Sequence, residues 1–228
     1  MKLSIIIPVL NEAEGLPGLL KHLDALRGEN SEVIVVDGGS EDGSRQVASS
    51  AGTKVIRSER GRARQMNAGA AVAKGDILLF LHADTLLPSS AKQAIESAIS
   101  HDGGTGEFAW GRFDVRISGR SVMLRVVASM MNWRSRLSGI ATGDQAMFVT
   151  RRAFESVGGF PDQPLMEDIE LSKRLLALSR PICLSDRAVT SGRRWDAHGV
   201  WSAIWMMWRL RWLYWRGVSA DELAKSYR

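Results

Sequence analysis

The stretch LLFLHADTLLP, residues 78–88, is an apolar run that ends in a histidine and a carboxylate before it closes at Pro88. With the two residues before it, the run predicts a buried strand over residues 76–82. Because side chains alternate along a strand, His82 and Asp84 would then point to the same side. Open α/β sheets bind their ligands at the carboxyl ends of their strands. The stretch therefore predicts an α/β sheet with a polar site where this strand ends.

Strands and helices alternate along the chain before this stretch. Apolar runs predict strands at 2–10, 32–37 and 54–58, and helical patterns fill the segments between them. The first of these helices is expected to end near Gly28. Strands that are continuous Val/Ile/Leu runs are typical of a parallel sheet covered on both faces.

The second half of the chain is less regular, and it begins with a predicted helix to about Ser100 and a loop at 103–107. Further patterns predict a strand at 108–117, a helix at 121–137, a strand at 146–150, a helix at 167–178 and a short strand at 181–186. We expect one α/β domain over residues 1–195, with a parallel-rich sheet flanked by helices. A C-terminal helical extension is expected over residues 196–228.

The composition is that of an ordinary globular protein, with 45% hydrophobic and 24% charged residues. The single cysteine, Cys183, cannot form an internal disulfide, and we expect a small core residue there. No run approaches the ~20 apolar residues that a membrane-spanning helix needs, and no segment resembles a signal peptide. We therefore expect a cytoplasmic protein, either free or peripheral on the inner face of the membrane.

The positive charge is concentrated in the C-terminal segment. The chain has a net charge of +5, and residues 193–228 hold seven basic residues against three acidic ones. This placement favours a local anionic partner over a nucleic-acid surface, so no nucleic-acid partner is expected.

The same segment contains a tryptophan stripe. Five tryptophans are spaced four, three, four and three residues apart, which places them on one face of a helix: Trp201, Trp205, Trp208, Trp212 and Trp215. Packing on the core is one interpretation. Because tryptophan prefers boundaries between apolar and aqueous phases, an anionic membrane surface, a lipid-like acceptor or a homodimer seam are the others.

Five motifs stand in the order found in family 2 glycosyltransferases of the GT-A fold, and the resemblance covers about residues 1–180. They are SIIIPVLNE, VIVVDGGSEDGS, GRARQMNAGAAVAKGDILLFLHADT, GDQAMFV and MEDIELSKRL. HADT, TSGRRW and the ending RLRWLYWRGVSADELAKSYR resemble a narrower branch, the radical-SAM/selenodomain-associated transferases that are linked by name to arsenosugar biosynthesis. The family resemblance implies an inverting transfer of sugar from a UDP- or GDP-type nucleotide-sugar to an acceptor hydroxyl, assisted by Mn²⁺ or Mg²⁺.

The resemblance assigns the donor side to Pro8, Glu12, Asp37, Arg60, Arg62 and His82. Pro8 and Glu12 match the loop that holds base and ribose, and Asp37 matches an acid that accepts a hydrogen bond from a uracil-type N–H. The family often has a second acid after this one, where Gly38 stands here. Arg60 or Arg62 lies near the diphosphate, at a predicted helix start of the kind that binds phosphate readily.

The resemblance assigns the metal and the acceptor to the opposite side of the site. Asp84 matches the acid that touches the metal, and His198 is a second candidate ligand. If His82 also binds metal, its nitrogen favours Mn²⁺ over Mg²⁺. Asp168 matches the general base, although acids at a helix start are also favoured by the helix dipole. Asp144, Glu167 and Trp195 are expected on the acceptor side.

Two other classes of protein compete with a glycosyltransferase. A sugar-phosphate nucleotidylyltransferase needs a glycine-rich loop with Arg and Lys soon after the first strand, where this chain has VLNEAEGLPG. A non-catalytic nucleotide-sugar-binding module would not need both Asp84 and Asp168. We therefore favour the enzyme.

Overall fold

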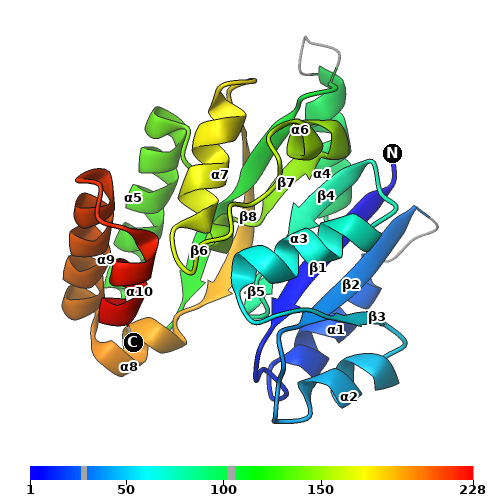
Figure 1. Cartoon of the computed structure of the whole chain (residues 1–228), viewed down its shortest axis with the longest axis horizontal. Coiled ribbons are helices and arrows are strands. Elements are labelled where there is room, and N and C mark those ends of the chain that lie inside the picture. The colour runs from blue at the N-terminus through cyan, green and yellow to red at the C-terminus, as the bar shows by residue number, and fades with distance from the viewer. Residues whose placement is uncertain (27–29, 102–105, 228) are drawn as a thin grey trace.

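The protein is described by a computed structural model that covers residues 1–26, 30–101 and 106–227. The side chains of Arg194, His198 and Tyr227 are not described, and Gly28 and most of the predicted loop at 103–107 lie outside the described residues. A central sheet carries helices on both of its faces (Figure 1). Among the described residues, no helix is both long enough and apolar enough to cross a membrane.

The sheet is mixed, with its parallel part at the N-terminal end of the chain. Its strands, in the order β3-β2-β1-β4-β7-β6-β8-β5, have these bounds: β1 Leu3–Val9, β2 Ser31–Asp37, β3 Lys54–Arg57, β4 Ile77–Phe80, β5 Thr85–Leu86, β6 Trp110–Ser118, β7 Met147–Thr150 and β8 Ile182–Ser191. Strands β1 to β4 run parallel, whereas β7 is antiparallel to β4 and β6, and β5 to β8. The predicted parallel-rich α/β sheet is confirmed.

The helices follow most of the predicted segments. Their bounds are α1 Leu16–Asp24, α2 Ser44–Ser50, α3 Arg62–Val72, α4 Ala91–His101, α5 Met123–Ser138, α6 Arg151–Ser156, α7 Glu167–Leu176, α8 Arg193–His198, α9 Val200–Trp215 and α10 Ala220–Tyr227, with a 3₁₀ turn at Gly143–Gln145. The sequence patterns missed α6 and α8, whereas α9 and α10 lie in the expected helical extension. Helix α8 crosses the boundary that we predicted between residues 195 and 196.

The strand predicted over residues 76–82 is shorter in the structure, and it does not continue straight to Asp84. Strand β4 ends at Phe80, and the backbone then turns, with the N–H of Thr85 donating to the carbonyl of His82 at 3.1 Å. The chain leaves β4 here because Thr85 and Leu86 pair with β8 instead. Side-chain alternation therefore does not align His82 with Asp84. The run looks like one strand because Leu81 stays buried beyond the end of β4.

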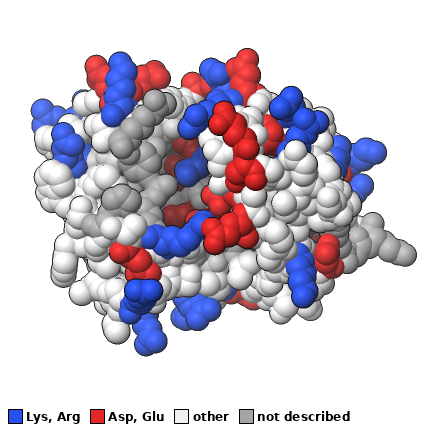
Figure 2. All heavy atoms as spheres, turned by 90° about the horizontal axis from the view of Figure 1, so that it is seen from below, with Lys and Arg blue, Asp and Glu red and all other residues white. Residues whose placement is uncertain are grey.

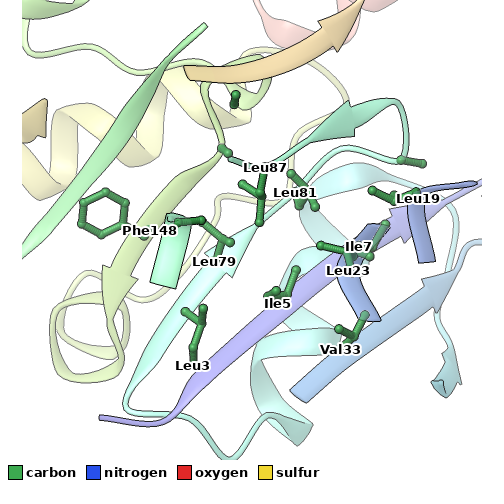
Figure 3. Packing of buried hydrophobic residues seen from close by; sticks show 14 of the residues in the cluster. Leu3, Ile5, Ile7, Leu19, Leu23, Val33, Leu79, Leu81, Leu87 and Phe148 are labelled. Atoms are coloured by element: carbon green, nitrogen blue, oxygen red, sulfur yellow. The ribbon is translucent and has the colours of Figure 1, made fainter. Parts of the chain in front are cut away.

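Alternating side chains of the strands build a core on each face of the sheet. Ile5 and Ile7 of β1 lie on the face covered by α1, together with Leu79 of β4 (Figure 3). Ile6 lies on the other face, in the core that α3 and α7 cover. Gly69 of α3 allows this helix to approach β1 closely, because a Cβ there would lie 2.4 Å from Cγ2 of Ile6.

Gly69→Ala is expected to destabilise the fold, because the added methyl group meets buried side chains of Ile6 and Val36. Overpacking of this kind costs about 1–3 kcal/mol, which lowers the Tm of a chain of this size by roughly 2–4 °C per kcal/mol. Gly18→Ala on α1 is the matched control, because a Cβ there has no atom within 4 Å. Equal melting temperatures for the two variants, measured by thermal unfolding, would contradict this packing.

The C-terminal helices pack on the sheet domain through one face only. Leu210 of α9 is buried against Met166 and Ile169, and Ile204 packs on the cluster formed by β6 and α5. All five tryptophans of the predicted stripe face outward, with 54–79% of each residue exposed. The interpretation in which these tryptophans pack on the core is therefore wrong.

Candidate active site

The candidate site lies at the edge of the sheet where the parallel strands β1, β2 and β4 end. Figure 2 views the molecule from this side and shows a hollow near the middle of the face, where acidic and basic side chains gather. Asp37 ends β2 and is only 1% exposed. Its Oδ1 accepts a hydrogen bond from the N–H of Ser40 at 3.0 Å, whereas Oδ2 is buried without a partner. Because buried polar atoms are almost always paired, this oxygen is suited to accept a ligand N–H.

Gln65 organises the same strand ends, and the sequence patterns did not identify it. Its Nε2 donates to the carbonyl of Val9 at 2.9 Å and to that of Val36 at 2.8 Å, which ties the ends of β1 and β2 together. A Cβ at Gly38 would lie 2.9 Å from Cδ of Gln65. The second acid that the family often has after Asp37 therefore has no room here.

The loop after β1 reaches across to the C-terminal segment. Glu12 lies just beyond the half-buried Pro8, and its Oε2 accepts from Nη2 of Arg193 at 3.3 Å. The N–H of Glu12 donates to Oγ of Ser44 at 2.8 Å, so the loop is also held by the start of α2. Both proposed donor-side residues thus lie at the sheet edge that Asp37 defines.

The arginines at the start of α3 divide into structural and available groups. Arg64 binds both carboxylate oxygens of Asp162, at 2.7 and 3.0 Å, and is therefore occupied. Arg62 is half-exposed and lies 3.9 Å from Oε1 of Glu167. Arg60 is exposed. Arg60 and Arg62 are thus not tied to Asp162 and stay the candidates for the diphosphate, and Arg62 also approaches the start of α7.

The centre of the site is a small pocket that contains the candidate base. Its polar lining comes from His82, Gly143, Glu167 and Asp168. Oδ2 of Asp168 accepts from the N–H of Gly143 at 2.9 Å, and Oδ1 accepts from the N–H of Ile169 at 2.8 Å. These two bonds fix the carboxylate in one orientation at the start of α7.

His82, which lines this pocket, contacts Asp144. Nδ1 of His82 lies 3.3 Å from Oδ1 of Asp144. A Cβ at Gly143 would lie 2.2 Å from Nε2 of His82, so only glycine allows the imidazole to pack here. The structure therefore brings together the four predicted residues His82, Asp144, Glu167 and Asp168. Trp195 is not brought to this pocket, because it packs beside β6 and α5.

Glu167 is buried, and it lies beside Asp168. Burial and the neighbouring charge both disfavour the ionised form of its carboxyl. Burial raises the pKa of its carboxyl, the charge of Asp168 raises it further, and Arg62 offsets part of this shift. A carboxyl whose pKa is raised by folding stabilises the fold below its unfolded pKa and loses that contribution as the pH rises through the folded pKa.

Glu167→Gln is therefore expected to be more stable than the unchanged protein at pH 7, because glutamine carries no charge to bury. The difference should vanish below about pH 4.3, where the unfolded carboxyl is also protonated. Urea unfolding at several pH values measures this. A stability difference that does not change with pH would show that folding does not raise this pKa, and a variant that is less stable at pH 7 but not in acid would show that Glu167 is stabilised as an anion.

Asp84 offers the hard oxygen ligand that a divalent cation prefers. It is half-buried at the start of β5, and its Oδ1 lies 3.4 Å from Oγ1 of Thr85. Over the part of the chain that is described, no three His, Cys, Asp or Glu side chains gather as a complete metal site. One carboxylate at this edge fits a cation that takes its remaining ligands from a bound diphosphate. The side chain of His198 lies outside the described residues.

The mixed α/β sheet, with polar side chains where its parallel strands end, has the architecture in which open α/β proteins bind their ligands. The family model "Glycosyl transferase family 2" matches residues 4–156. The chain therefore belongs to glycosyl transferase family 2.

The chain spans about half the length of the curated relatives that it matches. The probable glycosyltransferase YdaM of Bacillus subtilis is 25% identical over 92% of this chain and 54% of its own. The dolichol-phosphate mannosyltransferase of Pyrococcus furiosus is 30% identical over 75% of this chain and 49% of its own.

Solved structures share the fold. S. aureus TarS 1-349 in complex with UDP has a TM-score of 0.69 at 22% identity, covering 84% of this chain and 60% of that one. The mannosyltransferase PcManGT of Pyrobaculum calidifontis, in complex with GDP-Man and Mn²⁺, has a TM-score of 0.65 at 20% identity, covering 92% and 61%.

Proposed function

We propose that this chain transfers a sugar, with inversion, from a UDP- or GDP-type nucleotide-sugar to an acceptor hydroxyl. The observation that carries the proposal is that two carboxylates, one at a strand end and one at the central pocket, are suited to different roles. Asp37 has a buried oxygen free to accept from a base, and Asp168 is held at the pocket by two backbone N–H groups. The structural neighbours named as complexes with UDP and with GDP-Man support a donor of this class.

The proposed reaction needs one proton acceptor. The hydroxyl oxygen of the acceptor forms a bond to the anomeric carbon, while the bond from that carbon to the diphosphate oxygen breaks. The electron pair of the broken bond leaves on the nucleoside diphosphate, and the hydroxyl proton passes to the carboxylate of Asp168. A carboxylate is a sufficient base because the hydroxyl becomes acidic as its new bond forms.

A divalent cation fits the donor side of this proposal. Asp84 would hold Mn²⁺ or Mg²⁺ there, and the cation supplies charge stabilisation to the departing diphosphate. Arg62 and Arg60 would add positive charge on the same side. The neighbour in complex with GDP-Man and Mn²⁺ supports this assignment. The narrower resemblance to the radical-SAM/selenodomain-associated branch stays a prediction, as does the division of the chain at residue 195.

A thermal-shift screen of nucleotide-sugars tests the donor class. We expect UDP- or GDP-sugars to raise the Tm more in the presence of Mn²⁺ than without it. A screen in which no nucleotide-sugar shifts the Tm, with or without Mn²⁺, would count against the proposed function.

We also propose that the tryptophan stripe of α9 attaches the protein to an anionic membrane surface. The five tryptophans are exposed, and two arginines lie over their rings: Arg209 is 5.8 Å from the ring of Trp205, and Arg216 is 5.1 Å from that of Trp212. Interleaved Trp and Arg side chains match the apolar and phosphate layers of a membrane interface.

The neighbouring helix α5 extends this apolar surface. Exposed apolar side chains recur at helical spacing from the residue before α5 to its last turn: Val122, Val126, Met130, Trp133 and Leu137. Helices α5 and α9 lie side by side in Figure 1 and share the cluster around Leu124 and Ile204. Neither helix contains an acidic residue, whereas together they contain five arginines. Exposed apolar side chains together with an excess of arginines favour contact with an anionic lipid surface over exposure to water.

Replacing Trp208 and Trp212 by Ala is expected to weaken binding to anionic liposomes by at least about tenfold. Burial of a large apolar side chain contributes about 1.5–3 kcal/mol, and tenfold corresponds to about 1.4 kcal/mol. Flotation with anionic and zwitterionic vesicles measures the loss, and binding should also weaken with salt. Leu178→Ala, an exposed apolar residue beyond α7, is the control. If the intact protein does not bind liposomes and sediments as a dimer, the tryptophan stripe is a subunit interface instead.

A further inference from the structure

Two arginines, one from α5 and one from α9, interact electrostatically with the candidate base Asp168. Arg134 belongs to α5 and Arg211 to α9, and both are half-buried. Nε and Nη2 of Arg134 are fully buried and have no hydrogen-bond partner. Within the described part of the chain, no ion pair joins either guanidinium to a carboxylate. Because buried charges are normally paired, this arrangement requires an explanation.

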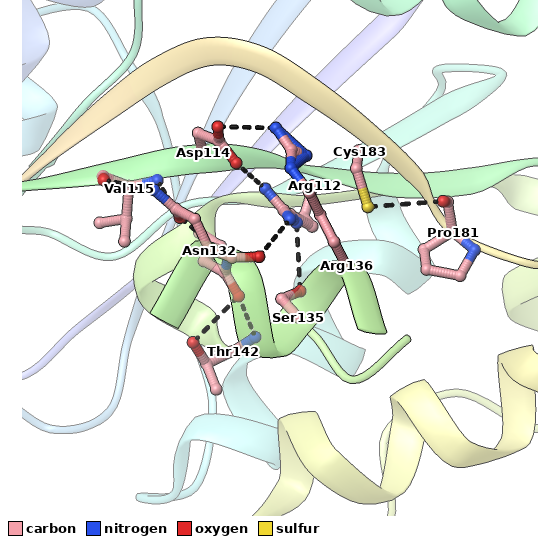
Figure 4. Close-up of polar contacts among 10 residues, drawn as sticks. Arg112, Asp114, Val115, Asn132, Ser135, Arg136, Thr142, Pro181 and Cys183 are labelled. Carbon is pink, nitrogen blue, oxygen red and sulfur yellow. Dashed lines mark hydrogen bonds and ion pairs between the residues drawn. The ribbon is translucent and has the colours of Figure 1, made fainter. Parts of the chain in front are cut away.

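Two other arginines of β6 and α5 show how guanidinium groups are paired in this part of the fold. Arg112 is fully buried, yet its Nε donates to Oγ of Ser135 at 3.1 Å, its Nη2 donates to the carbonyl of Asn132 at 3.1 Å, and its Nη1 pairs with Asp114 (Figure 4). Arg136 binds the other oxygen of Asp114 at 2.7 Å. Asp114 is thus already shared by two arginines, and Arg134 is left over.

The nearby carboxylates offset only part of the cost of burying Arg134 and Arg211. Burial lowers the pKa of Arg134 to about 10, the neighbouring charge of Arg211 lowers it further, and the charge of Asp168 opposes this shift. Burial also lowers the pKa of Arg211, while Asp168 and Asp144 raise it. The two cations therefore repel each other in a partly dehydrated place close to the candidate base. An anion bound between them would offset both the repulsion and the lost hydration.

The position of Arg134 and Arg211 in the fold indicates which substrate could carry this anion. Asp37 ends β2, near one edge of the sheet, whereas α5 packs on β6, on the other side of β1, β4 and β7. Helices α5 and α9 lie at the opposite end of the molecule from β2 and β3 (Figure 1). The central pocket with Asp168 lies between the two regions. The arginine pair is therefore on the acceptor side, and Arg62 serves the donor side.

We propose that Arg134 and Arg211 bind a phosphate-type group of the acceptor. This inference rests on the proposed function and names the class of its acceptor. Guanidinium groups bind phosphate through paired N–H donors, and they keep their charge in partly buried sites. A soluble phosphate ester and a lipid phosphate share this chemistry. The exposed apolar faces of the same two helices make the lipid a specific alternative to test.

Titration of inorganic phosphate into the full chain, followed by calorimetry, tests the site without donor or acceptor. Arg134→Gln and Arg211→Gln are each expected to weaken phosphate binding by about tenfold, because a hydrogen bond to a charged group contributes about 1.5–3 kcal/mol. Arg136→Gln is the matched control on the same helix, and it should retain binding. Arg62→Gln reports separately on phosphate that binds at the proposed donor side. Flotation with phosphatidic-acid vesicles is the second arm. A loss of flotation in Arg134→Gln assigns the phosphate to a lipid, and unchanged flotation assigns it to a soluble ester.

Stability separates an empty anion site from a structural arginine. Without phosphate, Arg134→Gln is expected to leave the Tm unchanged or raise it by about 2–4 °C. Arg112→Gln, which removes a fully bonded guanidinium, should lower it.

Equal phosphate affinity in the unchanged protein, Arg134→Gln and Arg211→Gln would overturn the proposal. So would a loss confined to Arg62→Gln, which would place the phosphate on the donor side. The proposed function fails separately, if nucleotide-sugars are neither bound nor consumed while phosphate still binds to the arginine pair.

Discussion

Asp168→Asn is expected to bind the nucleotide-sugar with unchanged affinity and to transfer its sugar about 10²–10⁴-fold more slowly, the usual loss when a positioned base is removed. The carboxylate is held by the N–H groups of Gly143 and Ile169, so its orientation is fixed before any acceptor arrives. An amide has the same shape but cannot take the acceptor's proton. The loss should therefore fall on kcat and not on donor affinity.

The controls for this variant come from the same helix start. Glu167→Gln changes the adjacent carboxyl and should keep most of the transfer rate. Because an amide retains only one of the two bonds that Asp168 accepts, thermal unfolding must show that Asp168→Asn is folded. Near-normal turnover in Asp168→Asn with the true acceptor would mean that another group, such as Glu167, takes the proton.

Asp84→Asn is expected to abolish the dependence of donor binding on Mn²⁺ while leaving the fold intact. The carboxylate is half-buried where β5 begins, and the backbone carbonyl of Asp84 already accepts from the N–H of Ser191 at 3.1 Å. Replacement of the side chain therefore leaves the local backbone pairing in place. Calorimetry of donor binding with and without Mn²⁺ measures the effect. The same Mn²⁺-dependent affinity in Asp84→Asn and in the unchanged protein would remove Asp84 from the metal site.

A control for Asp84 is available at the opposite edge of the sheet. Asp76 precedes β4 and binds the N–H of Lys2 at 2.8 Å, far from the strand ends that form the site. Asp76→Asn should leave the Mn²⁺ dependence unchanged. A loss of Mn²⁺ dependence in both variants would point to a general effect of charge.

The parallel part of the fold was predictable because each of its strands carries its own signal. The run around Ile6 is apolar on both faces, as a doubly covered strand must be, and β2 and β4 follow the same rule. The turn after Phe80 was not predictable from the pattern, because Leu81 and Ala83 remain buried after the strand has ended. Burial alone cannot distinguish a strand from a buried turn.

The residues of the candidate site also divide into those that the sequence predicts and those that it does not. Asp37 and Asp168 follow or begin regular elements within recognisable motifs, so their positions could be predicted. The positions of Gln65, Arg134 and Arg211 could not be predicted, because each lies within a helix whose pattern shows only which way it faces. Their roles depend on tertiary contacts between segments far apart in the sequence.

Release of nucleoside diphosphate from a nucleotide-sugar tests the central claim most directly. The full chain is incubated with UDP- and GDP-sugars and Mn²⁺, and the diphosphate is followed by ³¹P NMR. Asp168→Asn and Asp84→Asn are run beside it. The account predicts release from one donor class by the unchanged protein, accelerated by a phosphorylated acceptor and greatly reduced in both variants. Release that is equal in all three proteins, or no release from any donor that binds, would contradict it.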